Sequence, residues 1–138
     1  MKTIHIDVVS TEERIFSGNI SFAVIPTITG ELGIYPNHIP IMSIISPGVL
    51  RLTKEQEEII VAVSGGILEV RKNSITILAE VAIRSAQMDK QRAQKAKVQA
   101  QEELKKYSKD DKNFDKAKSK LDSAIAQLKA LEYIRSRK

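Results

Sequence analysis

Apolar and polar residues alternate one by one through the first half of the chain. Ile4, Ile6 and Val8 alternate with His5 and Asp7, and a period of two residues is typical of strands with one buried face. Further short apolar segments separated by Gly, Pro or Asn occupy residues 14–18, 20–24, 41–45, 49–52, 59–63, 67–70 and 75–79. Short strands at this spacing predict an antiparallel β-sandwich or barrel rather than a parallel sheet with crossover helices.

Turn residues predict where several of these strands end. We expect the second strand to end at Ser17-Gly18, and Ser46-Pro47-Gly48 and Gly65-Gly66 to form turns. Pro26 has no amide hydrogen, so it ends its strand or confines that strand to a sheet edge.

Beyond residue 84 the pattern changes, because the chain contains neither Gly nor Pro and its apolar residues recur every three or four positions. One such stripe comprises Ala93, Ala96, Ala100, Leu104 and Tyr107, and a second comprises Phe114, Ala117, Leu121, Ala124, Leu128 and Leu131. The polar residues 107–113 connect them, with Asn113 as the expected N-cap of the second helix. The prediction is an α+β chain with a sandwich over residues 1–84 and an antiparallel helical hairpin over residues 85–138.

The apolar side chains of the two helices differ in size, since the first helix offers mostly Ala and the second mostly Leu and Ile, with Ile125 beside its stripe. Each Ala contributes on the order of 1 kcal/mol when buried, against about 1.5–3 kcal/mol for a Leu. Two helices alone are therefore marginally stable and need a third surface. That surface is the sandwich, a partner protein, or each in turn.

Residues 30–40 form the one long insert, which holds two Gly and two Pro and predicts a loop with defined turns. Ile34, Tyr35 and Ile39 add apolar bulk to it. The loop either folds back on the sandwich or docks a partner. His38, taken alone, is interpreted as a polar loop residue rather than a ligand or a base.

Charge is divided unevenly between the two parts. Residues 1–84 carry seven Lys and Arg against nine Asp and Glu, whereas residues 85–138 carry fifteen against eight. A basic segment on a near-neutral body favours an acidic protein surface, an anionic ligand or nucleic acid as its partner. Acidic residues interleaved with the lysines are more typical of a solvated helix face than of a nucleic-acid site.

Composition excludes several kinds of chemistry. The chain has no Cys and two His, which argues against disulfides, thiolate chemistry and a histidine-built metal centre. No phosphate-binding loop or nucleophile motif is present, and we expect a non-enzyme with no metal. The first residues do not resemble a signal peptide, and the apolar runs are far shorter than a spanning helix requires. We expect a soluble, cytoplasmic protein, at most peripheral to a membrane.

Several motifs together resemble the epsilon subunit of bacterial F-type ATP synthase, the counterpart of the mitochondrial delta subunit. They are Gly-Glu-Leu-Gly-Ile-Tyr-Pro-Asn-His-Ile-Pro at residues 30–40, Ser64-Gly65-Gly66, Leu78-Ala79-Glu80, Ala82-Ile83-Arg84 and Met88-Asp89-Lys90-Gln91-Arg92-Ala93. The last is similar to the family's Ile/Leu-Asp-x-x-Arg-Ala motif, and the likeness covers nearly the whole chain.

This resemblance implies a non-catalytic rotor subunit in the central stalk of a proton-translocating ATP synthase, peripheral on the cytoplasmic face of the cell membrane. The sandwich would bind the gamma subunit and sit on the c-subunit ring, with Glu31 and His38 facing the ring. The hairpin would fold against the sandwich or extend along gamma toward the alpha and beta catalytic subunits, where it inhibits ATP hydrolysis. Lys116, Lys118 and Lys120 would then face acidic helices of those subunits.

The resemblance also implies a nucleotide contact at Asp89 and Arg92, where a carboxylate meets adenine or ribose and a guanidinium meets phosphate. Members that bind ATP tightly carry further arginines and a glutamate, whereas this chain has Gln99, Asp122, Ala126 and Ile83 at the corresponding positions. We expect ATP to be at most a weak regulatory ligand, and no cofactor to be required. Without the resemblance, Asp89 is interpreted as a helix cap and Arg92 as its i, i+3 partner.

Two other functions stay open on sequence grounds. The chain could be a free-standing interaction module whose basic tail binds nucleic acid, or a small ATP-sensing protein that works alone. If the chain is a rotor subunit of an ATP synthase, as the resemblance implies, we expect it to bind no nucleic acid and to contact the membrane only indirectly, through the complex.

Overall fold

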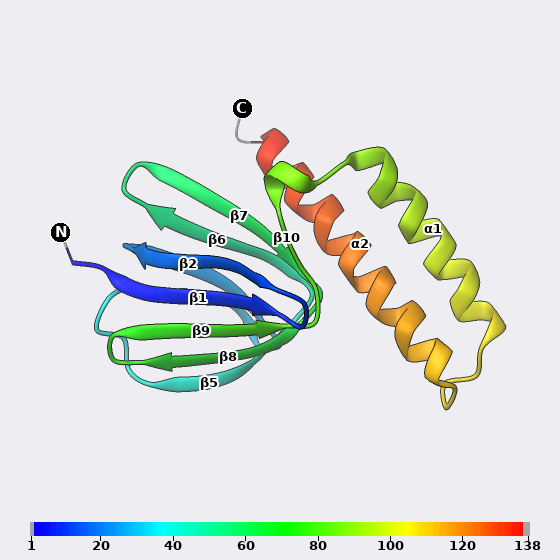
Figure 1. The fold of residues 1–138 in the computed structure, drawn as a ribbon, viewed down its shortest axis with the longest axis horizontal. Helices are drawn as coiled ribbons and strands as arrows, with labels where there is room; N and C mark the ends of the chain where they lie inside the picture. Colours follow the sequence, from blue (N-terminus) through cyan, green and yellow to red (C-terminus); the bar gives the residue numbers. More distant parts are fainter. Residues whose placement is uncertain (1, 137–138) are drawn as a thin grey trace.

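The computed structural model describes residues 2–136 and shows a β-sandwich followed by two helices, as predicted (Figure 1). The strands are β1 (Ile4–Ser10), β2 (Arg14–Ile20), β3 (Phe22–Thr27), β4 (Gly30–Ile34), β5 (Ile41–Ile45), β6 (Gly48–Lys54), β7 (Glu57–Val63), β8 (Gly66–Arg71), β9 (Ser74–Ala79) and β10 (Ala82–Arg84). A short 3-10 helix, Ser85–Gln87, leads into α1 (Lys90–Lys106) and α2 (Lys112–Ser136).

The strands form one folded sheet in the order β10-β7-β6-β3-β5-β8-β9-β1-β2. The remaining strand, β4, pairs with the edge of β3 opposite to β6. The sheet turns a corner between β3 and β5, where only Thr27 and Ile45 are paired. One layer therefore contains β4, β3, β6, β7 and β10, and the other contains β5, β8, β9, β1 and β2. All pairs are antiparallel except β1 with β9.

The two layers enclose one apolar core, which explains the alternation in the sequence. Successive side chains of a strand point to opposite faces, so every second residue is buried. Ile4, Ile6 and Val8 of β1 are at most 1% exposed. The other large, fully buried side chains come from seven further strands and are Ile20, Ile25, Ile34, Leu50, Leu52, Val61, Leu68, Ile75 and Ile77.

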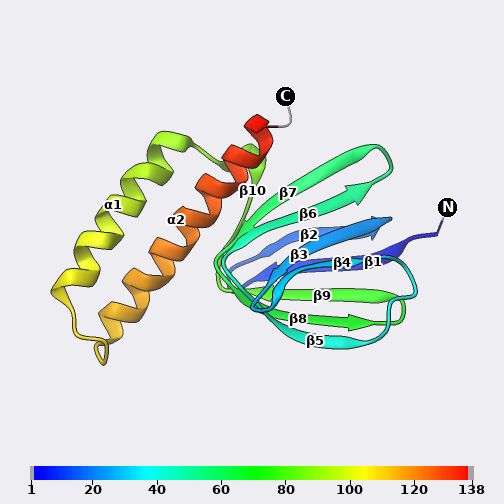
Figure 2. The same ribbon diagram turned by 180° about the vertical axis from the view of Figure 1, so that it is seen from behind.

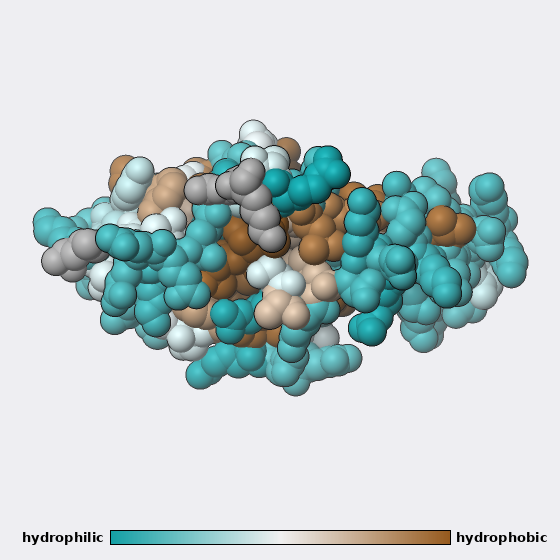
Figure 3. Space-filling model, turned by 90° about the horizontal axis from the view of Figure 1, so that it is seen from above, coloured by the Kyte–Doolittle hydropathy of each residue, from teal (hydrophilic) through white to brown (hydrophobic). Residues whose placement is uncertain are grey.

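The two helices form an antiparallel hairpin in which α2 lies between the sandwich and α1 (Figures 1 and 2). Their shared contact buries Ala93 and Ala100 of α1 with Ala117, Leu121 and Ala124 of α2. The outer surface of the hairpin is mainly hydrophilic, and hydrophobic residues appear in the middle of the molecule (Figure 3). No helix within residues 2–136 is both long and apolar enough to cross a membrane.

Three local expectations are wrong in the sandwich. Gly18 lies inside β2, opposite Ile6, where a Cβ would come within 3.3 Å of the Phe16 ring. Residues 30–34 form β4 rather than the start of a loop, and Pro26 is paired with Glu31 inside the sheet. The sequence pattern did not predict β10, which lies in the linker between β9 and α1, pairs with β7 and is held there also by two hydrogen bonds of 3.0 Å between Ser64 and Val81.

The predicted N-cap of the second helix is also wrong. The helix begins at Lys112, and the carboxylate of Asp111 accepts a hydrogen bond of 2.8 Å from the backbone amide of Asn113. Asp111 therefore supplies the capping oxygen that we expected from Asn113.

Candidate functional site

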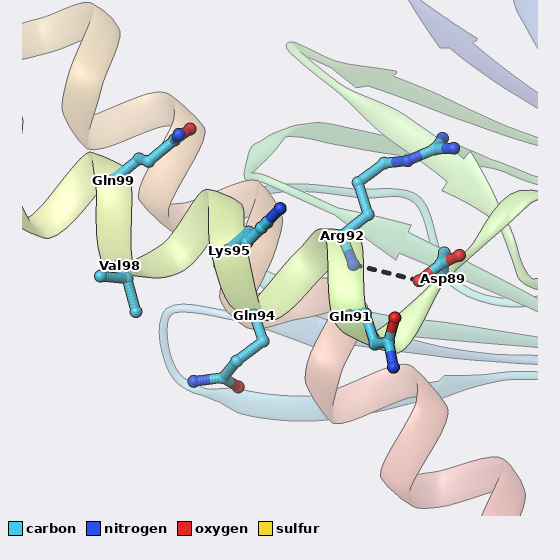
Figure 4. A pocket seen from close by; sticks show the side chains of 7 residues that line it. All are labelled: Asp89, Gln91, Arg92, Gln94, Lys95, Val98 and Gln99. Carbon is cyan, nitrogen blue, oxygen red and sulfur yellow. Dashed lines mark hydrogen bonds between the residues drawn. The ribbon is translucent and has the colours of Figure 1, made fainter.

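Asp89 and Arg92 lie together at the start of α1. Asp89 is the N-cap, and its Oδ1 accepts a hydrogen bond of 3.0 Å from the backbone amide of Arg92. The Arg92 guanidinium extends away from the helix rather than onto this carboxylate (Figure 4). The two residues border an open groove of about 730 Å³ that is also lined by Gln91, Gln94, Lys95, Val98 and Gln99.

The second helix contributes no side chain to this groove. Asp122 accepts a hydrogen bond of 3.2 Å from Lys118 one turn before it. Ala126 is fully buried on the side of α2 that faces the sandwich. Of Gln99, Asp122 and Ala126, Gln99 alone lines the groove together with Asp89 and Arg92.

The surface that holds α2 is the outer face of β6 and β7. Ala126 and Ala130 of α2 form a buried cluster with Ile60 and Ala62 of β7. Met88 packs against the edge of this cluster. Met88 is the apolar first residue of the motif at residues 88–93, the helix-start motif, and it anchors the linker beneath α2. This small apolar contact is the third surface that the hairpin requires.

A polar cluster borders the same contact near the C-terminal end of α2. The Tyr133 phenol donates hydrogen bonds of 3.0 and 3.1 Å to the two carboxylate oxygens of Glu58 on β7. The Arg51 guanidinium on β6 lies 5.0 Å from the centre of the Tyr133 ring and donates a hydrogen bond of 3.2 Å to Glu31 on β4. Sequence reasoning missed this cluster, since its members are far apart in the chain and fit no motif.

The environment of Arg51 stabilises its charged form. Its pKa is raised above the ordinary value, first by its hydrogen bond with Tyr133 and then by the charges of Glu31, Tyr133 and Glu58, while partial burial acts in the opposite direction. The Arg51 side chain is 25% exposed, whereas that of Glu31 is 62% exposed. Arg51 is thus a half-buried cation between an accessible carboxylate and the helix.

Glu31 and His38 are not brought together. Glu31 lies in β4 near the β3–β4 turn, and its carboxylate meets Arg51. His38 lies beyond the other end of β4, where its Nδ1 is 2.7 Å from the backbone oxygen of Ile39. At about 3.3 Å per residue, the strand keeps the two side chains at opposite ends of the layer.

The insert folds back on the sandwich along part of its length and leaves one apolar residue exposed. Ile34 is fully buried and Tyr35 stacks on Phe22 with ring centres 4.3 Å apart, so this part folds back on the sandwich. Ile39 is 79% exposed, so this part of the loop presents an apolar side chain to solvent.

The outer face of the β5–β8–β9 layer carries an apolar row. The register places Ile44 opposite Ile67 and Ile67 opposite Leu78, and all three are about half exposed or more. Ile28, whose amide donates to the backbone oxygen of Ile44 at 3.1 Å, extends the row, and Met42 lies beside it. Hydrophobic side chains gathered in this way are typical of an interaction surface.

The three lysines of α2 do not share one face. Lys116 and Lys120 are one turn apart and exposed, whereas Lys118 lies on another face and pairs with Asp122. The lysine pair Lys116 and Lys120 is thus the more available for an external anionic partner.

Ser17, His5 and Asp7 meet on β1 and β2, a combination that sequence reasoning did not identify. Ser17 donates a hydrogen bond of 2.6 Å to Asp7, and the His5 Nε2 lies 3.3 Å from Asp7 and 3.4 Å from Ser17. In a catalytic triad the acid and the serine use different ring nitrogens, whereas here both face Nε2. The hydrogen bond from Ser17 is the main reason that the pKa of Asp7 is lowered, and nothing in this arrangement activates the serine.

Comparison with known proteins identifies the family. Residues 3–85 match the family described as "ATP synthase, Delta/Epsilon chain, beta-sandwich domain", and residues 86–132 match "ATP synthase, Delta/Epsilon chain, long alpha-helix domain". An ATP synthase epsilon chain of Neisseria meningitidis serogroup C / serotype 2a is 54% identical over 140 residues, which span 100% of this chain and 99% of the relative. The chain belongs to the delta/epsilon family of ATP synthase subunits. An ATP synthase epsilon chain of Laribacter hongkongensis is 48% identical over 139 residues, with 99% of both chains covered.

Two solved structures contain a chain with the same fold. A chain in the cryo-EM structure of the Euglena gracilis mitochondrial ATP synthase (OSCP/F1/c-ring) aligns with a TM-score of 0.72 and 20% identity, over 96% of this chain and 81% of that one. A chain in the Tetrahymena thermophila mitochondrial ATP synthase central stalk/c-ring structure aligns with a TM-score of 0.56 and 14% identity, over 94% and 96%. Among residues 2–136 no group of three or more His, Cys, Asp or Glu could hold a metal ion.

Proposed function

We propose that this chain is the non-catalytic epsilon subunit in the central stalk of a proton-translocating F-type ATP synthase. The family match over both the sandwich and the helices is the observation that carries the proposal. As part of that complex, the chain would be peripheral on the cytoplasmic face of the cell membrane. It would reach the membrane only through its partner subunits.

The apolar row on the β5–β8–β9 layer is the surface proposed to bind the gamma subunit. It lies on the layer opposite the β6–β7 face that α2 covers, so a partner on the row does not displace the hairpin. Glu31, at the β3–β4 turn, is 62% exposed and is proposed to face the polar loops of the c ring. His38 stands apart from it and would contact a different part of the rotor.

Co-purification tests this assignment. Tagged gamma subunit should retain the chain from a mixture at physiological salt, in the absence of the c ring. Failure of gamma to retain a folded chain would contradict the proposal. Binding to nucleic acid with a steep loss of affinity between 50 and 200 mM salt would instead support the alternative of a basic-tailed nucleic-acid module.

The hairpin is proposed to inhibit ATP hydrolysis when α2 leaves the sandwich and extends toward the alpha and beta catalytic subunits. Within residues 2–136, a small apolar contact and a few polar contacts hold α2 on the sandwich, and an element of low local stability is suited to switching. Changing Lys116, Lys118 and Lys120 to Glu should relieve inhibition of ATP hydrolysis in the assembled complex. The same charge change at Lys2, Lys54 and Lys72 of the sandwich is the control, and equal inhibition by both variants would contradict the proposal.

ATP is proposed to be at most a weak ligand at Asp89 and Arg92. The groove is lined from one side only, and α2 directs neither a guanidinium nor an ammonium into it. Calorimetry of the isolated chain with ATP should give an affinity no tighter than the micromolar range. A sub-micromolar affinity would contradict this proposal and would favour an ATP-sensing role for the hairpin.

A further inference from the structure

Four side chains from four different elements form a continuous set of contacts from an exposed strand to α2. Glu31 of β4 meets Arg51 of β6 at 3.2 Å, and the Arg51 guanidinium lies 5.0 Å from the centre of the Tyr133 ring. The Tyr133 hydroxyl then meets Glu58 of β7 at 3.0 and 3.1 Å. The set begins at a carboxylate that solvent reaches, includes Tyr133 in the last turn of α2, and ends at Glu58 of β7.

We propose that Arg51, Glu58 and Tyr133 form a latch that holds α2 on the sandwich, and that Glu31 controls its strength. A cationic group of a docking partner that draws Glu31 away from Arg51 would weaken the hold on Tyr133 and favour release of α2. The link to a partner rests on the proposed function, whereas the latch is a property of the isolated chain.

The apolar contact beneath α2 is too small to fix the helix by itself. Its helix side is formed by Ala126 and Ala130, with Tyr133 and Ile134 at the border, and an Ala side chain buries far less apolar area than a Leu. The hydrogen bond from the Tyr133 phenol to Glu58 and the Arg51 cation over the Tyr133 ring therefore contribute a large share of the free energy that holds α2 on the sandwich.

Glu31 acts on the latch by positioning Arg51. An arginine side chain has several rotatable bonds, and an ion pair at one end of the guanidinium limits the orientations that it samples over the ring. Removal of the Glu31 carboxylate leaves the charge of Arg51 unchanged but lets its guanidinium sample more orientations over the Tyr133 ring. Because coupling between two sites is reciprocal, release of α2 would also change the affinity of Glu31 for a cationic partner by the same factor.

The position of α2 can be measured directly in the full-length chain. The sequence contains no Cys, so Lys72→Cys in the β8–β9 turn and Lys109→Cys in the helix connection provide two unique spin-label sites. Pulsed electron spin resonance then gives the ratio of molecules with α2 on and off the sandwich. Hydrogen exchange of the α2 amides measures the same equilibrium when the open population is small.

The Tyr133 hydroxyl is tested by Tyr133→Phe, which keeps the ring and removes the donor. The open-to-closed ratio should rise at least about tenfold, as expected for loss of one hydrogen bond to a charged group. Tyr107→Phe, at the end of α1, is the matched control and should leave the ratio unchanged. Equal ratios in the two variants would overturn the latch.

The role of Glu31 is tested by Glu31→Gln, which should raise the ratio about two- to threefold, in the range of an exposed ion pair. Glu69→Gln removes a similar ion pair with Arg71 on β8 and should have no effect. In an Arg51→Gln background, Glu31→Gln should have no further effect. An undiminished effect in that background, or none in the wild-type chain, would overturn the control by Glu31.

Hydrogen exchange of core amides such as those of Ile6 and Leu50 shows whether each variant keeps its sandwich. An intact sandwich with an altered ratio supports the latch. Exchange that rises equally in the sandwich and in α2 would mean a general loss of stability and would overturn it. These measurements need no partner, so they are separate from the co-purification that tests the proposed function.

Discussion

The carboxylate of Asp89 accepts a hydrogen bond of 3.0 Å from the backbone amide of Arg92 and so closes the first turn of α1. The two most specific residues of the helix-start motif are joined through the backbone of one of them, not through an ion pair. The same carboxylate that would contact a nucleotide therefore already stabilises the helix.

Asp89→Ala should destabilise the start of α1 by about 1 kcal/mol, because it removes the oxygen that satisfies a free amide. Asp89→Asn keeps a capping oxygen and should retain most of this stability. Hydrogen exchange of the Arg92 amide is the measurement. Equal protection in the Ala variant and the wild-type chain would show that the cap contributes nothing.

Ala126→Leu should weaken the attachment of α2 to the sandwich by about 1–3 kcal/mol, since the site is fully buried and has no space for a larger side chain. Ala86→Leu, at an exposed position of the linker, is the matched control. Faster hydrogen exchange in α2, with an unchanged sandwich core, is the expected result. An Ala126→Leu variant that behaves like the control would mean that this contact is not closely packed.

Gly66→Ala should cost roughly 3 kcal/mol or more of stability, because strain at positive φ is joined by a clash with backbone. Its φ is 152°, and a Cβ there would lie 2.1 Å from the Leu78 backbone oxygen. Gly30 has a φ of 119° but no atom near the site of a Cβ, so Gly30→Ala reports strain alone and should cost about 1–3 kcal/mol. Denaturant unfolding of both variants separates the two effects, and equal losses would contradict the predicted clash.

Asp7 should contribute stability on the acid side of the pH profile. Its folded-state pKa is lower than the ordinary 3.8, first because of the hydrogen bond from Ser17, so this contribution is present above pH 3.8 and is lost as the pH falls through the folded-state pKa. Asp7→Asn should reduce the loss of stability between pH 5 and pH 3, by about 0.5 kcal/mol or less for so exposed a group. Glu12→Gln is the matched control, and identical acid profiles for Asp7→Asn and the wild-type chain would contradict the prediction.

The alternation of apolar residues predicted most of the strands because each strand has one face in the core. It failed where a strand depends on a partner that the pattern cannot show. Gly18 reads as a turn residue, although its missing side chain leaves room for the ring of Phe16 within β2. The linker strand β10 depends on its pairing with β7 and on the hydrogen bonds that Ser64 and Val81 exchange beside it, and Ser64 and Val81 are 17 residues apart in the sequence.

The helix-start residues were predictable because capping is local, and the structure places Asp89 as the N-cap that its position predicts. The contact between α2 and the sandwich was not, because Ala126 and Ala130 look like ordinary helix-forming residues. Tyr133 and Glu58 are 75 residues apart, and their pairing depends on which face of α2 the sandwich covers. Tertiary packing alone decides that choice.

The affinity of the gamma subunit for the apolar row tests the account most directly. Ile44→Glu combined with Ile67→Glu places two charges in the middle of the row and should weaken binding of gamma by at least about 100-fold, as loss of central apolar contacts does. Val98→Glu, which changes an exposed apolar residue of α1, should bind gamma like the wild-type chain. Equal affinities for all three folded proteins would contradict the proposal that this face joins the chain to the rotor.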